Sequence, residues 1–257
     1  MKRIVAIILL ALLIVASTFT LAACSGIKSQ EWYDALEAYK TADAITLTIK
    51  DEVWTYKNTI LDNHIRYKIT ITFDAIAGTA SVITSSGHND LSGVYWNDGS
   101  TAEYYYVLDG TNLIMYYRYV SESSSDWQRR KTIEFDTAEL AIEYMRDLYL
   151  NPCNTEKVEF PSFLELPYYG ENMTATGNPR ETKVNMFKNK FTQKYVDEEN
   201  QITRIYVLTF SNDKLSKYHF ELKPDFLLSD RRKTTINIRY LSTLNLPDNL
   251  PTEDFSS

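Results

Sequence analysis

The alternation of apolar and polar residues is the feature of this sequence that most limits its fold. From Ile65 to Phe73 every second side chain is apolar, and the residues between them are charged or hydroxylated. Side chains of a β-strand point to opposite faces in turn, so this pattern predicts a strand with one face on a core and the other in water. Ile45, Leu47 and Ile49 repeat the pattern nearer the N-terminus and predict a second half-buried strand.

Turn residues divide the other apolar stretches into further strands. Asn97-Asp98-Gly99 is predicted to separate strand 94–96 from strand 103–108, and Asp109-Gly110-Thr111-Asn112 to join the latter to strand 113–120. Glycine supplies the positive φ that such hairpin connections need. Additional strands are predicted at residues 127–135, 187–196, 204–210, 215–222 and 234–241, with a hairpin tip at Ser211-Asn212-Asp213-Lys214.

Two segments have helical periodicity instead. The first runs from about Gln30 to Thr41, with apolar residues spaced by three and four. The second follows Asp136, which is expected to cap it together with Glu139 three residues later. No strand–helix–strand rhythm is present, so the expected class is α+β, mainly β, built on antiparallel strands.

The N-terminus has the order of an export signal. Two cations, Lys2 and Arg3, precede an apolar run from Ile4 to Ala16. This run of about 13 residues is shorter than the ~20 that a membrane-spanning helix needs. The pattern is therefore typical of a signal peptide over residues 1–23, with a retained signal anchor as an alternative.

The next residues, Leu21-Ala22-Ala23-Cys24, resemble the lipobox of bacterial lipoproteins. The resemblance implies that Cys24 becomes the acylated first residue of the mature chain, anchored in the cell membrane on its extracytoplasmic side. An ordinary signal peptide cleaved after Ala23 is the alternative. Residues 24–29 would form a short tether, and Ser25 resembles the sorting pattern for an outer membrane if the host has one.

Charge excludes one class of partner. Without Lys2 and Arg3, the 27 basic side chains fall to 25 against 34 acidic ones, a net charge of −9 for the mature chain. Nucleic acid requires concentrated positive charge, so it is not expected as a partner. Membrane attachment is therefore assigned to the acyl chains.

The order of elements resembles the lipoprotein-carrier folds of bacterial envelopes, the LolA/LolB and LppX-like group. The resemblance rests on a helix running into a strand over 32–49, the hairpin 205–222 and the end of the chain, 236–247. It implies a curved antiparallel sheet (half-barrel) with an N-terminal helix and a second helix packed on it, and an apolar cavity for acyl chains. The expected domain spans 30–246, undivided or split near 155, followed by an extended tail, 247–257.

Catalytic and metal-binding patterns are missing from the sequence. His64, His88 and His219 stand far apart; His88 with Asp90 is interpreted as a polar loop pair, and His219 as exposed. There is no nucleophile elbow, Cys–His arrangement or phosphate loop. Acidic pairs at 51–52 and 198–199 are interpreted as solvated turn charges, and Cys153 as a passive residue. The sequence predicts no enzyme, metal site or cofactor.

Aromatic residues provide the remaining functional signal. Six tyrosines crowd the hairpin 104–119, where they suit either a binding surface or cross-strand packing. We expect a binding or carrier domain for a lipid or another amphiphile; the alternatives are an envelope protein that docks a partner through a Tyr-rich face and, less well supported, a hydrolase. The candidate ligand-binding residues are Tyr67, Ile69, Ile71, Phe73, Tyr104, Tyr106 and Tyr117.

Overall fold

Two helices and eleven strands make up the part of the chain that the computed structural model describes, residues 29–57, 60–89, 95–121, 125–150, 181–185, 190–197, 201–224, 230–242 and 244–252. The helices are α2 (Ser29–Lys40) and α3 (Ala138–Leu150). The first six strands precede α3: β1 (Ala44–Lys57), β2 (Ile60–Asp74), β3 (Thr79–Asn89), β4 (Tyr95–Asp109), β5 (Asn112–Val120) and β6 (Trp127–Glu134). The other five follow it: β7 (Glu181–Asn185), β8 (Lys190–Asp197), β9 (Ile202–Ser211), β10 (Lys214–Pro224) and β11 (Arg231–Arg239).

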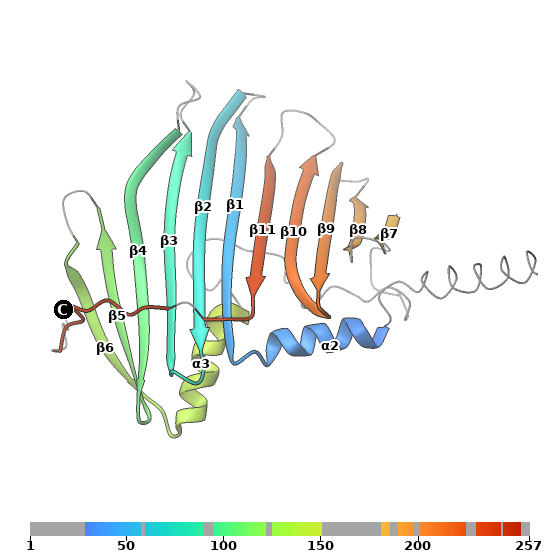
Figure 1. The fold of residues 1–257 in the computed structure, drawn as a ribbon. Helices are drawn as coiled ribbons and strands as arrows, with labels where there is room; N and C mark the ends of the chain where they lie inside the picture. The colour runs from blue at the N-terminus through green and yellow to red at the C-terminus, as the bar shows by residue number, and fades with distance from the viewer. Residues whose placement is uncertain are drawn as a thin grey trace, which may run out of the picture.

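All eleven strands belong to one open, antiparallel, curved sheet (Figure 1). Its order is β6-β5-β4-β3-β2-β1-β11-β10-β9-β8-β7, so each half of the sheet is a meander of neighbouring strands. The two meanders meet where β1 pairs with β11, in a register that runs from Thr46 opposite Arg239 to Trp54 opposite Arg231. The expected mainly-β half-barrel with two helices is confirmed, and the two β blocks form a single sheet.

The alternation in the sequence separates the two faces of the sheet. In β1, Ile45, Leu47 and Ile49 are fully buried and lie on the face against which the helices pack, here called the helix face. Thr48 and Lys50 point to the opposite side, the outer face. Cross-strand partners keep this division, because residues directly opposite each other in a register share a face.

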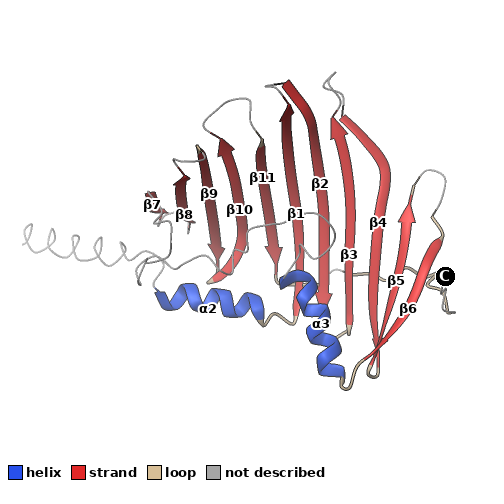
Figure 2. Cartoon of the chain, turned by 180° about the vertical axis from the view of Figure 1, so that it is seen from behind, coloured by secondary structure: helices blue, strands red, loops and turns tan. Residues whose placement is uncertain are grey.

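Both helices lie at the same end of the strands on the helix face (Figures 1 and 2). Helix α2 contacts β10, and α3 crosses β2, β3, β4 and β5. The buried face of α3 consists of Ala141, Met145 and Tyr149, as its periodicity predicts. The cap lies one residue later than predicted, at Thr137, whose Oγ1 accepts a hydrogen bond from the Leu140 amide at 3.3 Å.

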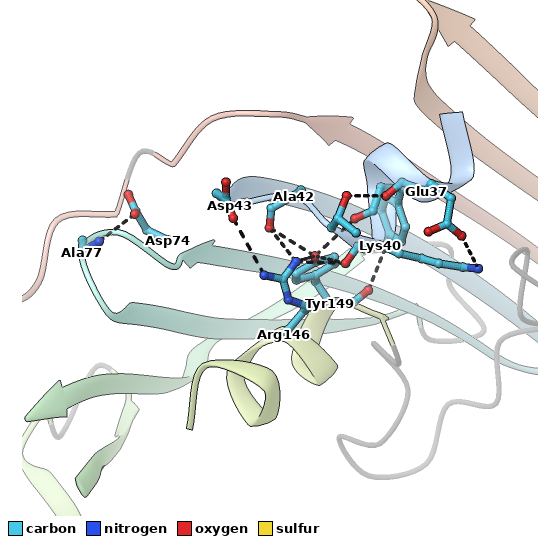
Figure 3. A network of polar contacts seen from close by, with 10 residues as sticks. Glu37, Lys40, Ala42, Asp43, Asp74, Ala77, Arg146 and Tyr149 are labelled. Carbon is cyan, nitrogen blue, oxygen red and sulfur yellow. Dashed lines mark hydrogen bonds and ion pairs between the residues drawn. The ribbon is translucent and has the colours of Figure 1, made fainter. Parts of the chain in front are cut away.

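A network of polar contacts fixes the two helices to each other (Figure 3). Tyr149 of α3 donates its hydroxyl to the carbonyl oxygens at the end of α2, 3.2 Å from that of Tyr39 and 3.1 Å from that of Lys40. Arg146 Nη1 donates to the carbonyl oxygen of Lys40 at 3.0 Å and to that of Ala42 at 3.2 Å. In return, the Tyr39 hydroxyl donates to the carbonyl oxygen of Tyr149 at 2.7 Å. The last carbonyls of α2, which have no partner within the helix, are thereby satisfied by α3.

Most predicted strands are present, but one predicted turn is wrong. The segment Asn97-Asp98-Gly99 lies inside β4 and makes no hairpin. The pairing of β4 with β3 shifts there, from Ser85 opposite Thr101 to Gly87 opposite Asn97, so the extra residues form a bulge. Strands β3 and β7 were not predicted. The hairpin turns at Gly110 (φ 63°) and at Asn212-Asp213 (φ 50° and 57°) are confirmed.

Candidate functional site

The seven candidate ligand-binding residues all lie on the helix face. Register brings them together across β2, β4 and β5: Phe73 is in the row of Tyr106, and Ile71 is in the row of Tyr104 and Tyr117. Strand β3 runs between them and contributes only the small side chains Ala80 and Val82 to these two rows. Residues that lie 33 to 46 positions apart in the sequence thus share two rows of the helix face.

Burial divides the candidates into two groups. Ile69, Ile71, Phe73 and Tyr106 belong to the closed hydrophobic core. The ring of Phe73 lies 5.4 Å from that of Tyr149 in α3, so this row is already covered by the helix. Burial raises the pKa of Tyr106 well above its usual range, and Tyr144 of α3 adds to the effect. These four residues stabilise the fold and have little surface left for a ligand.

The other three candidates, Tyr67, Tyr104 and Tyr117, keep partly accessible side chains. The rings of Tyr104 and Tyr117 pack at a centroid distance of 4.7 Å and an angle of 33°. The next row away from α3 contains Ile69, Thr84, Ala102 and Tyr119, with the smaller residues in the middle. This stretch of small side chains at Thr84 and Ala102, with Ile69 of β2 on one side and Tyr119 of β5 on the other, is here called the trough.

The crowded tyrosines do not form a single surface. Tyr105 and Tyr116 point to the outer face, where both rings make edge contacts with Trp127, at 5.9 and 6.1 Å. Tyr105 donates to Oε2 of Glu103 at 2.9 Å. Burial and this hydrogen bond raise the pKa of Tyr105 to about 12. Of the six tyrosines, only Tyr119 is classed as exposed, at 40 %.

A buried charge lies on the helix face beside Tyr67, and the sequence interpretation of it is wrong. Asp51 was expected in a solvated turn, yet it lies within β1 and is 0 % exposed. Its carboxylate accepts hydrogen bonds from Arg232 Nε at 3.0 Å, Arg232 Nη2 at 3.1 Å and Thr234 Oγ1 at 2.6 Å. The alternation of β1 could have indicated this. Asp51 follows Ile45, Leu47 and Ile49 at every second position, and every second residue of a strand lies on the same face.

His219 points to the outer face as predicted, but it is half-buried rather than exposed. Its Nδ1 lies 2.9 Å from Oγ1 of Thr235. Burial lowers the pKa of His219, and nearby lysines, Lys233 foremost, lower it further against the opposing effect of Glu221.

Several predicted sites lie outside the described residues or side chains. These are Cys24, Cys153, the pair 198–199, the side chain of His88 and all of Asp90. Within the described part of the chain, no three His, Cys, Asp or Glu side chains gather at a distance suited to a metal ion. None of the described helices is both long and apolar enough to cross a bilayer.

The sequence matches no protein-family model. It also matches no protein with a curated description. The function therefore has to be inferred from the geometry of this chain.

Proposed function

We propose that this chain is a lipoprotein anchored through Cys24 on the extracytoplasmic side of the cell membrane, and that its sheet binds a lipid or another amphiphile without catalysis. One observation carries the proposal: on the helix face, the small side chains of Thr84 and Ala102 stand next to partly accessible tyrosines of β4 and β5. Aromatic rings beside small residues make a shape into which an extended acyl chain fits by burial alone.

The magnitude of burial is sufficient for binding. An acyl chain that hides ~300 Å² of apolar surface gains about 7 kcal/mol at ~25 cal/mol per Å². The cost of association, at least about 4 kcal/mol, offsets part of this gain. The ligand is therefore held reversibly, as a carrier requires.

The ends of the trough differ in polarity, which suits an amphiphile better than a wholly apolar ligand. Tyr67 stands directly opposite Asp51, and Arg232, which binds Asp51, stands opposite Val53 in the next row. Arg232 keeps 20 % of its side chain accessible, so a partly accessible ion pair borders the apolar rows. A polar head group placed there would keep contact with charge and water while its acyl chain lies along the trough.

The decisive experiment blocks the trough and leaves the rest of the sheet unchanged. The domain from Ser25 onward is secreted from its own host behind a cleavable signal, purified without detergent, and analysed by native mass spectrometry and solvent extraction. We expect a co-purifying lipid of defined mass. The variant Ala102→Trp fills the trough and should lose that lipid.

The matched control is Thr101→Trp. Thr101 is the preceding residue of β4, similarly half-buried, and points to the outer face, so its replacement adds the same ring outside the trough. It should retain the lipid. A protein free of ligand, even after incubation with host lipids, would remove the basis for the carrier proposal and favour an envelope module that docks another protein.

The anchor is tested separately. In the full chain, Cys24→Ser should move the protein from the membrane fraction to the soluble fraction and remove the mass of the acyl groups. Retention in the membrane without any acyl mass would contradict lipidation at Cys24.

A further inference from the structure

The outer face of the sheet carries two neighbouring hollows with basic linings. The first, of ≈ 330 Å³, is lined on strands β8, β10 and β11 by Lys190, Lys217 and Lys233. The second, of ≈ 360 Å³, is lined on β1 and β2 by Lys50, Lys68 and Arg66 together with Glu52. None of these side chains points toward the trough, which lies on the opposite face.

The two hollows adjoin where the meanders meet. Strand pairing places Lys50 of the second hollow directly opposite Thr235 of the first, and Glu52 directly opposite Lys233. The linings therefore form a band three rows wide across the strands, from β8 to β3, here called the basic line. Adjacent strands are ~4.8 Å apart, so this line is roughly 29 Å long.

The charge along this line is opposite to that of the whole protein. The full chain has a net charge of −7, whereas the two hollows present six cations and one carboxylate among their described lining residues. That carboxylate, Glu52, is already bound to Arg66, with Oε1 and Nε 2.8 Å apart. Lys50 and Lys68 stand directly opposite each other, an arrangement of like charges that destabilises a sheet. An anion lying across these strands would relieve that repulsion.

We infer that this basic line binds a linear polyanion with repeating phosphate groups. Lys217, Lys233, Lys50 and Lys68 lie on four consecutive strands. Lys50 and Lys68 share a row, Lys233 lies one row to one side of it and Lys217 one row to the other side. A flexible chain that crosses the strands therefore passes a cation on each of them. A lysine ammonium binds phosphate as a point charge without a fixed geometry, which tolerates a flexible polymer. Thr209 also lines the first hollow and offers a hydroxyl donor.

Other anionic partners fit this surface less well. A bilayer surface is usually bound by basic residues together with inserted apolar ones, and none of the exposed large apolar residues of the described chain lines either hollow. Single-stranded nucleic acid needs aromatic rings on which successive bases stack. The described lining contains one tyrosine, Tyr67, whose side chain alternates to the helix face, and one imidazole ring, that of His219, so it offers no series of rings for successive bases.

His219 provides an internal reporter for the bound anion. It lines the first hollow, and the groups that face it are Lys217, Lys223 and Lys233, Glu221 and Thr235. The lysines contribute to its lowered pKa, so phosphate groups that neutralise them should raise the pKa of His219.

The test uses the full chain in non-ionic detergent and fluorescently labelled linear inorganic polyphosphate. Affinity is measured by anisotropy over a range of salt concentrations, since the slope of log K against log salt reports the cations engaged. The variant Lys217→Gln with Lys233→Gln should bind about tenfold more weakly at low salt, with a slope lower by about two. The control Lys131→Gln, an exposed lysine of β6 outside the hollows, should bind like the wild type.

Folding of each variant is checked by circular dichroism, and the His219 titration is followed by NMR. Polyphosphate should raise the His219 pKa in the wild type. Equal binding by the double variant and the wild type, or an unchanged His219 titration, would overturn the inference. The inference would also be overturned if orthophosphate, at the same total phosphate concentration, competed fully with polyphosphate. Tighter binding of anionic phospholipid vesicles or of oligo-dT than of polyphosphate would overturn it as well. Ala102→Trp should leave polyphosphate binding unchanged, so this result is independent of the amphiphile proposal.

Discussion

Replacing Asp51 with alanine tests whether the buried ion pair holds the two meanders together. The carboxylate is 0 % exposed and accepts two hydrogen bonds from Arg232 and one from Thr234, across the pairing of β1 with β11. Removing one member of a buried ion pair costs ~3–5 kcal/mol, because the other charge is left without compensation. Arg232 is 20 % exposed and keeps some hydration, which places the expected loss near ~3 kcal/mol.

Two further variants separate the ion pair from general damage to β1. Glu52→Ala removes the neighbouring carboxylate, which binds Arg66 on the outer face with both side chains partly exposed, and should cost less than ~1 kcal/mol. Asp51→Leu with Arg232→Met replaces the pair by apolar side chains and leaves only the Thr234 hydroxyl without its acceptor. This double variant should lose about 1 kcal/mol, much less than the single substitution.

Urea unfolding followed by tryptophan fluorescence and circular dichroism gives the free energies, with the slope m as a check on two-state behaviour. The reasoning is refuted if Asp51→Ala costs no more than Glu52→Ala. It is equally refuted if the double variant is as unstable as Asp51→Ala, since the loss would then reflect packing and not an uncompensated charge.

Three other expectations use the same unfolding measurement. Tyr149→Phe removes the hydroxyl that binds the end of α2 and should cost ~1–2 kcal/mol; an unchanged midpoint would mean that solvent replaces it. Gly110→Ala should cost ~1 kcal/mol, because φ is 63° and no atom lies within 4 Å of the new Cβ. Gly78→Ala should cost more, because the new Cβ would also lie 3.0 Å from Cβ of Leu108. A larger loss for Gly110→Ala than for Gly78→Ala would contradict this reasoning. The pKa of His219 is lower in the folded protein than in the unfolded chain, so the unfolded chain binds a proton at a higher pH. The free energy of unfolding should therefore fall as the pH drops below about 6.5. His219→Gln should weaken this pH dependence, and equal pH profiles of the variant and the wild type would disprove it.

The sequence predicted those strands whose alternation is strong. Ile65–Phe73 shows the pattern over nine residues, and it lies within β2 with its apolar positions on the helix face. The tip at Asn212-Asp213 was equally predictable, since both residues adopt the positive φ that their type tolerates. In these cases the local sequence and the tertiary environment favour the same conformation.

The remaining features depend on partners that are distant in sequence. Strand β3 contains mostly small and hydroxylated residues, and it is a strand because β2 and β4 pair with both of its edges. Asn97-Asp98-Gly99 resembles a turn, but the pairing of β3 with β4 absorbs it as a bulge. The environment of Asp51 depends on Arg232, which lies across the sheet and 181 residues away in the sequence. No local pattern reports such a contact, although the phase of Asp51 within β1 points to the buried face.

The pairing of β1 with β11 also sets the order in which the sheet is completed. Each meander joins strands that follow one another in the chain, so it can form as soon as those strands are available. Strand β1, in contrast, pairs with β11, the last of the described strands. Until β11 is available, the backbone groups of β1 and the apolar side chains of Ile45, Leu47 and Ile49 lie at an unprotected edge. A free edge of this kind pairs readily with strands of other molecules. As the chain emerges with its N-terminus first, β1 is therefore an edge open to aggregation until β11 is available, and any delay before β11 emerges extends that period.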